Sequence, residues 1–389
     1  MKQWMVRHAL LVSTVVIAAG VMLFLLMLTL PAQPVSAAPL TQDISNDTCL
    51  FCHKEEGKSV DIGGQPLALT IDGKKFDASV HAEEGIACVD CHSNITSFPH
   101  PEVTASSPRD FSLEMYATCQ KCHSEQYQKQ LDSVHQKAIA GGNSNAAVCT
   151  DCHNPHTQTR LNDTATGRLL FSAKQNIPQT CAKCHSAIYD AYSTSVHGSD
   201  LLNEDNPDVP TCIDCHGVHN IGDPTTNTFR NSVPGLCAEC HTNQALMSKY
   251  GLSTNVLNTY VADFHGTTVK MFEETYPDQP TNKPVCIDCH GFHDIKRVDD
   301  PEKGLSVKNN LLTKCQQCHP DATTETFTDA WLSHYEPSPT TWPLVYYVNL
   351  FYKFFIPAVL GGMVFYILTD IYRRFIVPRF NRGKGASHK

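Results

Sequence analysis

Hydrophobic residues are concentrated at the two ends of the chain, and the long middle is polar. One apolar run without charges extends from Ala9 to Leu30, and a second, from Leu344 to Thr369, is interrupted only by Lys353. The region between them is poor in core-forming residues for its length. This pattern predicts terminal segments that serve export or anchoring, and a middle that is not held together by a conventional core.

The first apolar run has the features of an export signal. Lys2 and Arg7 precede it, and Val35-Ser36-Ala37 offers the small residues of a cleavage site. We therefore expect residues 1–37 to be a signal peptide. An uncleaved anchor is the alternative, because the apolar run is longer than a usual signal core. Both interpretations place everything after Ala38 outside the cytoplasm.

The second apolar run predicts a transmembrane helix. At a rise of about 1.5 Å per residue, it is long enough to cross a hydrocarbon core of about 30 Å. A basic tail without acidic residues follows Asp370, which is typical of a cytoplasmic end. We expect a linker over 321–343, the membrane helix over 344–372 and a cytoplasmic tail over 373–389.

The 18 cysteines of the chain all fall into nine Cys-x-x-Cys-His units. Two thiols at this spacing reach the two vinyl groups of one haem, and the next histidine lies beneath the iron as its proximal ligand. Disulfides or zinc sites would not explain a histidine after every second cysteine, and a thioredoxin-like motif needs a βαβ context. The units therefore predict nine haem c groups. The cysteines are Cys49, Cys52, Cys88, Cys91, Cys119, Cys122, Cys149, Cys152, Cys181, Cys184, Cys212, Cys215, Cys237, Cys240, Cys286, Cys289, Cys315 and Cys318, and the proximal histidines are His53, His92, His123, His153, His185, His216, His241, His290 and His319.

The other histidines decide what those haems can do. Of the 20 histidines, His8 belongs to the export signal and His388 to the cytoplasmic tail. Nine spare histidines remain in the compartment of the nine haems, which predicts two histidine ligands on every iron and no open position for a substrate. These candidate distal ligands are His81, His100, His135, His156, His197, His219, His265, His293 and His334.

The spare histidines recur in an internal repeat. Ser-Val-His ends at His81, His135 and His197, with Phe-His-Gly around His265 in the same place. A second type lies three residues after a proximal histidine. The repeat runs four times, from Cys49, Cys119, Cys181 and Cys237, and then half a time from Cys315, while His100 and His334 are less regular.

Spacing limits which iron a histidine of the second type can bind. Three residues of extended chain reach roughly 10 Å, which is too short to pass around a porphyrin and approach the same iron from behind. His156, His219 and His293 must therefore bind a neighbouring haem. Spacing leaves open which spare histidine serves which iron.

The predicted nine-haem domain, 38–320, has about 30 residues for each haem between Cys49 and His319, too few for a separate core around each one. The expected fold is haem-packed, with short α-helices, irregular loops and little β structure, followed by the C-terminal transmembrane helix. Helical turns are expected at the motifs and over Glu125–Ile139. Loops are expected over Asn203–Pro210 and Gly222–Thr228.

Residues 49–334 resemble bacterial multihaem cytochromes c of the cytochrome c3 or doubled Cys-x-x-Cys-His class. The resemblance rests on the order Cys-x-x-Cys-His, Ser-Val-His, Cys-x-x-Cys-His-x-x-His. It implies electron transport between membrane quinones and periplasmic or extracellular acceptors. Membrane-anchored quinol dehydrogenases are a related comparison, but their anchor is N-terminal and the anchor here is C-terminal.

These features predict a respiratory electron carrier on the outer face of the cell membrane. Because the membrane helix contains no histidine, a separate quinone-reactive subunit of the cytochrome b type is expected beside it, with a soluble or surface redox protein as the other partner. The alternatives are a reductase of a small nitrogen or sulfur oxyanion with one open haem, and a subunit of an extracellular cytochrome filament. A formal net charge of −9 without a basic cluster argues against nucleic-acid binding.

Overall fold

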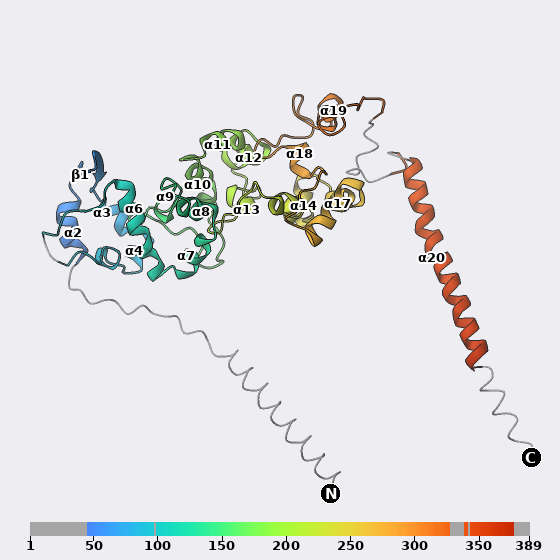
Figure 1. Cartoon of the computed structure of the whole chain (residues 1–389), viewed down its shortest axis with the longest axis horizontal. Helices are drawn as coiled ribbons and strands as arrows, with labels where there is room; N and C mark the ends of the chain where they lie inside the picture. Colours follow the sequence, from blue (N-terminus) through green and yellow to red (C-terminus); the bar gives the residue numbers. More distant parts are fainter. Residues whose placement is uncertain (1–44, 97–98, 327–337, 341–342, 377–389) are drawn as a thin grey trace, which may run out of the picture.

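A computed structural model describes residues 45–96, 99–326, 338–340 and 343–376 (Figure 1). The expected export signal, His334 and His388 lie outside these residues. Within them the chain is mostly helical with irregular connections, as the sequence predicts. A hairpin of β1 (Ser59–Ile62) and β2 (Gln65–Ala68) and an isolated bridge between Asn162 and Leu169 are the only β structure in the described part.

The helices are short and follow the repeats. In the first repeat they are α2 (Asn46–His53), α3 (Gly73–Asp77), α4 (Val80–Glu83), α5 (Cys88–Cys91) and α6 (Pro108–Met115). The second repeat contains η1 (Tyr116–Lys121), α7 (Ser124–Leu131), α8 (Val134–Ala140) and α9 (Cys149–Cys152). The third begins at the end of α10 (Phe171–Ala182) and contains α11 (Ser186–Ser193), α12 (Val196–Asn203) and α13 (Cys212–His216). The fourth begins at the end of α14 (Asn227–His241) and contains α15 (Gln244–Met247), η2 (Ser248–Tyr250), α16 (Val256–Ala262), α17 (Phe264–Thr275) and α18 (Cys286–His290), and the last half repeat begins at the end of α19 (Lys308–Gln316).

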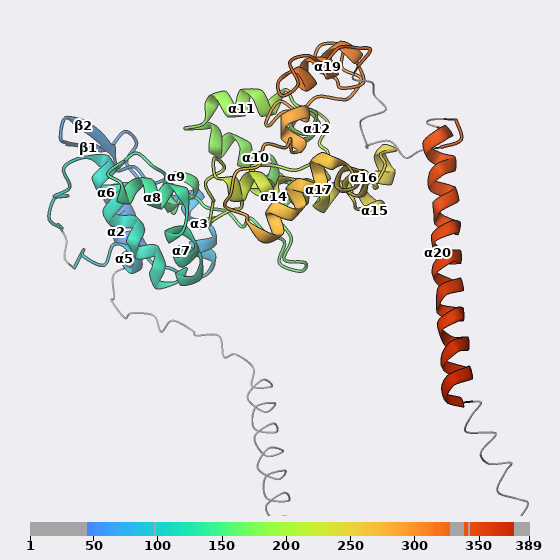
Figure 2. The ribbon, with the colours of Figure 1, turned by 45° about the vertical axis from the view of Figure 1, so that its right-hand side comes forward.

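The repeats follow one another in space in the order of the sequence. Figure 1 shows α2 at one end of the haem-motif region and α17 and α19 toward the other, and in the turned view of Figure 2 α15 and α16 lie at the end far from α2, with α19 above α12. The first cysteine of every motif lies in a helix or a 3-10 turn. The region is therefore an extended row of similar units.

The helical turns expected over Glu125–Ile139 are present as two helices, α7 and α8, because Ser133 separates them and caps the second by accepting a hydrogen bond from the Gln136 N–H. The predicted loop Asn203–Pro210 is one residue too long, because α12 ends at Asn203. The predicted loop Gly222–Thr228 is two residues too long, because α14 begins at Asn227. Its N-cap Thr226 accepts from the Phe229 N–H at 3.2 Å.

The apolar cores of the described region are small. One cluster joins Tyr192, Leu201 and Val209, and another joins Val233, Val269 and Val285. Clusters of three buried residues are too small to hold a region of this length together, which agrees with the expectation that bound cofactors supply most of the apolar surface.

A tyrosine and a glycine organise the turn before α12 and again before α17. The Tyr192 hydroxyl donates to the Pro210 carbonyl at 2.8 Å, and the Tyr260 hydroxyl donates to the Pro284 carbonyl at the same distance. These prolines lie two residues before a motif. Six residues after each tyrosine is a glycine, and a Cβ on Gly198 would lie 1.9 Å from the Tyr192 carbonyl oxygen. Glycine is therefore required at this position, because a side chain would prevent the close approach of the α12 backbone to the Tyr192 carbonyl.

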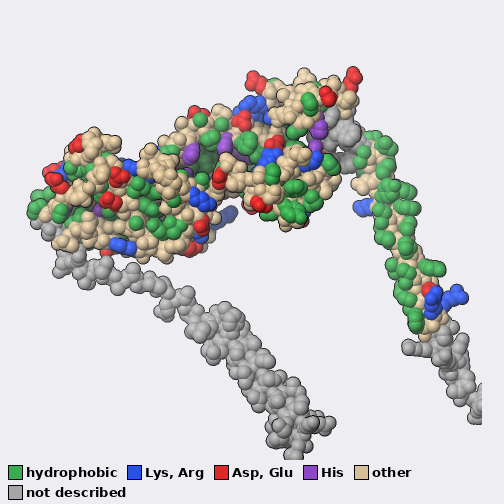
Figure 3. All heavy atoms as spheres, viewed as in Figure 1, with side chains coloured by type: hydrophobic (Ala, Val, Ile, Leu, Met, Phe, Trp, Pro, Cys, Tyr) green, Lys and Arg blue, Asp and Glu red, His purple; other side chains and the backbone are tan. Residues whose placement is uncertain are grey.

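The long helix α20 (Pro343–Ile371) and the short turn η4 (Tyr372–Ile376) follow the row of motifs. The most apolar 18-residue window of the stretch Pro343–Phe375 has a mean hydropathy of 1.9 and no buried residue. Hydrophobic side chains cover it in Figure 3, whereas charged side chains are spread over the motif region. Length and composition therefore make it the candidate membrane span among the described residues.

Replacing Gly198 by alanine should destabilise the haem-loaded protein by about 1–3 kcal/mol, because the added methyl group meets backbone that cannot move freely. Denaturant unfolding of the purified holoprotein measures this. The matched control is Gly222→Ala, since a Cβ there meets nothing within 4 Å. Equal midpoints for the two variants would contradict the packing described for the turn.

Candidate haem sites

The second motif of each repeat has the form Cys-x-Asp-Cys-His, and its aspartate holds the motif helix. The carboxylates of Asp90, Asp151, Asp214 and Asp288 each accept from the N–H of the residue before the first cysteine, at 2.6 to 2.8 Å. An acidic residue at this position satisfies an N–H that would otherwise be unpaired at the helix start. The cap therefore fixes the turn that presents both cysteines and the histidine.

Successive motifs lie next to one another. Within a repeat, the thiols of the two first cysteines are close enough to hydrogen-bond, as in the pairs Cys119 with Cys149 and Cys181 with Cys212. Between repeats, the second cysteine of one motif lies near the first cysteine of the next, as with Cys152 and Cys181. The Lys183 ammonium also donates to the Asp151 carbonyl at 3.0 Å. The motifs therefore form one continuous row.

Proximal and spare histidines face each other in eight pairs, with ring centres 6.0 to 6.4 Å apart. A ligating imidazole nitrogen lies about 2 Å from a first-row metal, so two rings on one iron have centres about 6 Å apart. The separation therefore fits an iron between the rings. The pairs are His53 with His100, His92 with His156, His123 with His81, His153 with His219, His185 with His135, His216 with His293, His241 with His197, and His319 with His265.

Each type of spare histidine faces a motif of a particular neighbouring repeat. Histidines of the Ser-Val-His type face the first motif of the following repeat, as His81 faces His123. Histidines three residues after a motif face the second motif of the preceding repeat, as His156 faces His92. Among the described spare histidines, only His100 faces a proximal histidine of its own repeat. Each interface between the first four repeats is thus crossed in both directions.

A backbone hydrogen bond joins the two chain segments that cross each interface. The N–H groups of Val80, Val134 and Val196 donate to the carbonyls of Gln158, Ile221 and Ile295, each at 2.8 Å. Each donor immediately precedes a forward-facing histidine, and each acceptor lies two residues after a backward-facing one. The serine before each valine is buried and caps the following helix. The serine cap and the valine hydrogen bond together explain why Ser-Val-His recurs, which the sequence alone did not explain.

Hydrogen bonds and burial prepare several rings for metal binding. Nδ1 of His53, His81 and His100 lies 2.8 to 2.9 Å from a backbone carbonyl, which leaves Nε2 as the unprotonated nitrogen. Burial also lowers the pKa of most paired histidines, to about 4 for His197, so that the neutral ligating form is favoured. The others with a lowered pKa are His92, His123, His135, His156, His216, His219, His241 and His293.

Two arginines belong to the motif surroundings and were not anticipated from the sequence. Arg109 pairs with both carboxylate oxygens of Asp151, at 2.8 and 3.0 Å, and Arg230 pairs with both oxygens of Asp288, at 2.8 and 2.9 Å. The aspartate that recurs in the second motif of each repeat could have suggested that a cationic residue lies nearby. Which arginine that is, however, depends on the fold.

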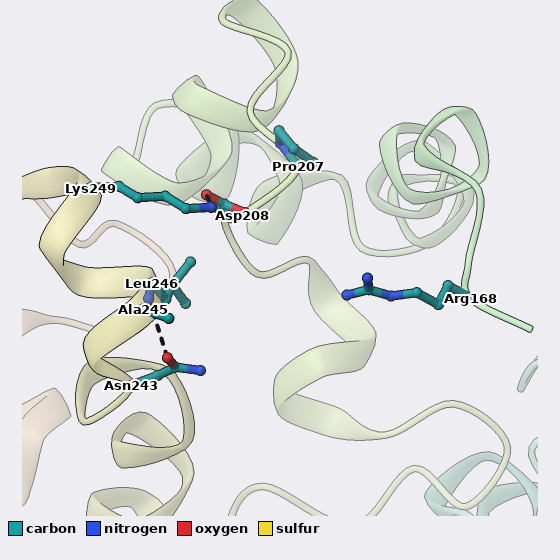
Figure 4. Close-up of a pocket in the computed structure, with 7 residues that line it drawn as sticks. All are labelled: Arg168, Pro207, Asp208, Asn243, Ala245, Leu246 and Lys249. Carbon is teal, nitrogen blue, oxygen red and sulfur yellow. Dashed lines mark hydrogen bonds and ion pairs between the residues drawn. The ribbon is translucent and has the colours of Figure 1, made fainter. Parts of the chain in front are cut away.

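A surface cleft has no role in these sites. It is lined by Arg168, Pro207, Asp208, Asn243, Ala245, Leu246 and Lys249 (Figure 4). None of these residues belongs to a motif or is a spare histidine, and the Lys249 ammonium is already paired with Asp208 at 2.7 Å.

Comparisons with known proteins agree with the motifs. The family model described as "Doubled CXXCH motif" matches residues 138–188, which contain the motifs at Cys149 and Cys181. The multiheme cytochrome MtrA of Shewanella baltica (strain OS185) is 26% identical over 203 residues, which is 50% of this chain and 52% of that protein. The chain thus spans about half the length of this curated relative. No solved structure gives a significant match.

Replacing Ser133 by alanine should cost about 1 kcal/mol of stability, because it removes the buried cap of the helix that carries His135. Chemical denaturation of the holoprotein provides the measurement. Ser144→Ala is the control, since Ser144 is exposed and only its carbonyl is used, by Arg109. A loss as large in the control as in Ser133→Ala would refute the capping role.

Proposed function

We propose that this chain, a multihaem c-type cytochrome, conducts electrons along a row of nine bis-histidine haems between a membrane partner and a second redox protein. The observation that carries the proposal is the set of eight facing histidine pairs, which follow the order of the motifs from α2 to α19. When bound, haem supplies a one-electron couple between ferric and ferrous iron.

The ligand set follows from the pairs. We assign the 18 cysteines to thioether bonds, the motif histidines to the proximal positions and the spare histidines to the distal positions. The histidines after the second motifs of the second, third and fourth repeats face the second motif of the preceding repeat. The same register assigns His334, which lies outside the described residues, to the iron on His290. This assignment uses nine proximal and nine distal histidines.

The short separation between successive motifs supports electron transfer along the row. Packed elements connect neighbouring motifs, as where α10 contacts α13 and α14 contacts α18. Because the backward and forward histidines of each repeat bind to adjacent repeats, the protein would hold consecutive haems at fixed separations. Two histidines at an iron exclude a substrate there, so electron transfer is favoured over the reductase alternative.

The location proposed is the outer face of the cell membrane, with α20 as the anchor. The ninth motif, on α19, is the last before this helix and is the proposed point of exchange on the membrane side. Since α20 has no histidine that could bind haem b, a quinone-reactive membrane subunit of the cytochrome b type is the proposed partner there. A soluble or surface redox protein would dock toward α2.

The ligand set predicts nine haems per chain by mass spectrometry and only low-spin ferric iron by electron paramagnetic resonance. His334→Ala should convert one haem in nine to high spin, because it removes one distal ligand. His388→Ala is the matched control and should leave every haem low-spin. A high-spin haem in the unmodified protein would contradict bis-histidine ligation and would revive the reductase alternative.

Deleting residues 343–389 should release the haem-loaded protein into the soluble periplasmic fraction, because α20 carries the proposed anchor. Membrane fractionation with detection of haem absorbance measures the distribution, and the full chain serves as control. Retention of the shortened protein in membranes would instead identify an uncleaved N-terminal anchor.

A further inference from the structure

The motif aspartates place negative charge beside every second haem of the row. Asp90, Asp151, Asp214 and Asp288 each immediately precede the second cysteine of an even-numbered motif. A nearby carboxylate favours the ferric state of a haem, because the oxidised iron carries one more positive charge than the reduced iron. Unless a cation offsets it, each aspartate therefore lowers the reduction potential of its haem.

In the second and fourth motifs a lysine from the next motif offsets this charge. The Lys121 ammonium donates to the Asp90 carbonyl at 3.3 Å and to the Ser93 hydroxyl at 3.1 Å. Lys183 donates to the Asp151 carbonyl at 3.0 Å in the same way. Both lysines occupy the residue before the second cysteine of the following motif.

The eighth motif is offset by different residues. Arg230 grips the Asp288 carboxylate with two hydrogen bonds of 2.8 and 2.9 Å. Lys314, which immediately precedes the ninth motif, also acts on this site, because its charge opposes the rise in the pKa of Cys289.

The sixth motif lacks such a cation. Glu239 occupies the position that Lys121 and Lys183 hold in their motifs. The Asp214 carboxylate accepts from the Thr211 N–H at 2.7 Å, and it forms no ion pair within the described part of the chain. Glu239 likewise has no cationic partner among those residues. Two carboxylates therefore act at the sixth motif, where the haem on Cys212, Cys215 and His216 would be bound.

The cysteine thiols report the same difference in local charge. Burial, followed by negative charges that include Asp214 and Glu239, raises the pKa of Cys215 to about 11, and no lysine opposes the rise. At Cys91 and Cys152 a lysine does oppose it. Lys174 acts on the seventh motif, at Cys240, while its ammonium is held by the Pro207 carbonyl at 2.8 Å.

We propose that Glu239 and Asp214 give the sixth haem the lowest reduction potential of the four even-numbered haems, and that Glu239 is the residue that distinguishes it. This inference rests on the proposed haem ligation. An electron that moves from the seventh to the sixth haem oxidises one iron as it reduces the next, and no bond forms or breaks. The sixth haem would then be the weakest electron acceptor of the even-numbered haems, with three haems on its membrane side and five on its outer side.

The proposal is tested by spectropotentiometric titration of the full-length holoprotein and of variants that change the charge at Glu239 by one or two units. Glu239→Gln should raise the midpoint potential of a component that carries one ninth of the haem absorbance, and Glu239→Lys should raise it further. Lys183→Glu should lower one other component. Glu114→Lys, on the exposed face of α6 in the first repeat, adds the same charge as Glu239→Lys and should leave the low-potential component unchanged.

The shifted component is assigned to the sixth haem in a His293→Ala background, where the haem on His216 becomes high-spin and spectroscopically distinct. Glu239→Lys should raise the potential of that high-spin component. Unchanged midpoints in Glu239→Lys, or a shift equal to that of Glu114→Lys, would overturn the proposal. If His293→Ala produces no high-spin haem, the proposed ligand pairing fails instead, which separates the two conclusions.

Discussion

The facing of two imidazoles from different repeats, which we propose to bind one iron between them, is the interaction on which the rest of this structure depends. A histidine three residues beyond a motif cannot reach the far face of its own iron, so it must serve another one. His156 and His81 therefore cross the same interface in opposite directions, toward His92 and His123. Each repeat completes the sites of its neighbours, and no repeat is complete alone.

The dependence of each repeat on its neighbours explains how the chain can fold with so small an apolar core. Clusters such as Val233, Val269 and Val285 are small, and the buried serines cap helices of only one or two turns. Such helices are marginal in isolation. The backbone bonds from Val80, Val134 and Val196 align the two segments that cross each interface. In the proposed holoprotein, cofactor bonds and these hydrogen bonds replace the apolar packing of an ordinary domain.

A row of similar sites also makes small departures from the repeat informative. His100 faces His53 in its own repeat, whereas His123, His185 and His241 each face a histidine of the preceding repeat. Glu239 stands where two other repeats have lysine, and Arg109 and Arg230 reach two of the four motif aspartates. If every iron has the proposed pair of histidine ligands, local charge is the variable by which the protein can grade electron affinity along the row.

The sequence alone determined the chemistry. Nine motifs and the two recurring types of spare histidine state the cofactor class, and the three-residue spacing at His156 excludes its own iron, because these depend only on residue identity and chain reach. The direction of each pairing depended on the tertiary structure, because His81 faces His123, 42 residues away, and not the nearer motif histidines His53 and His92. The same holds for Arg109 beside Asp151, a contact across 42 residues that no local pattern encodes. Long-range contacts are set by how the repeats stack, and that arrangement is a property of the whole chain.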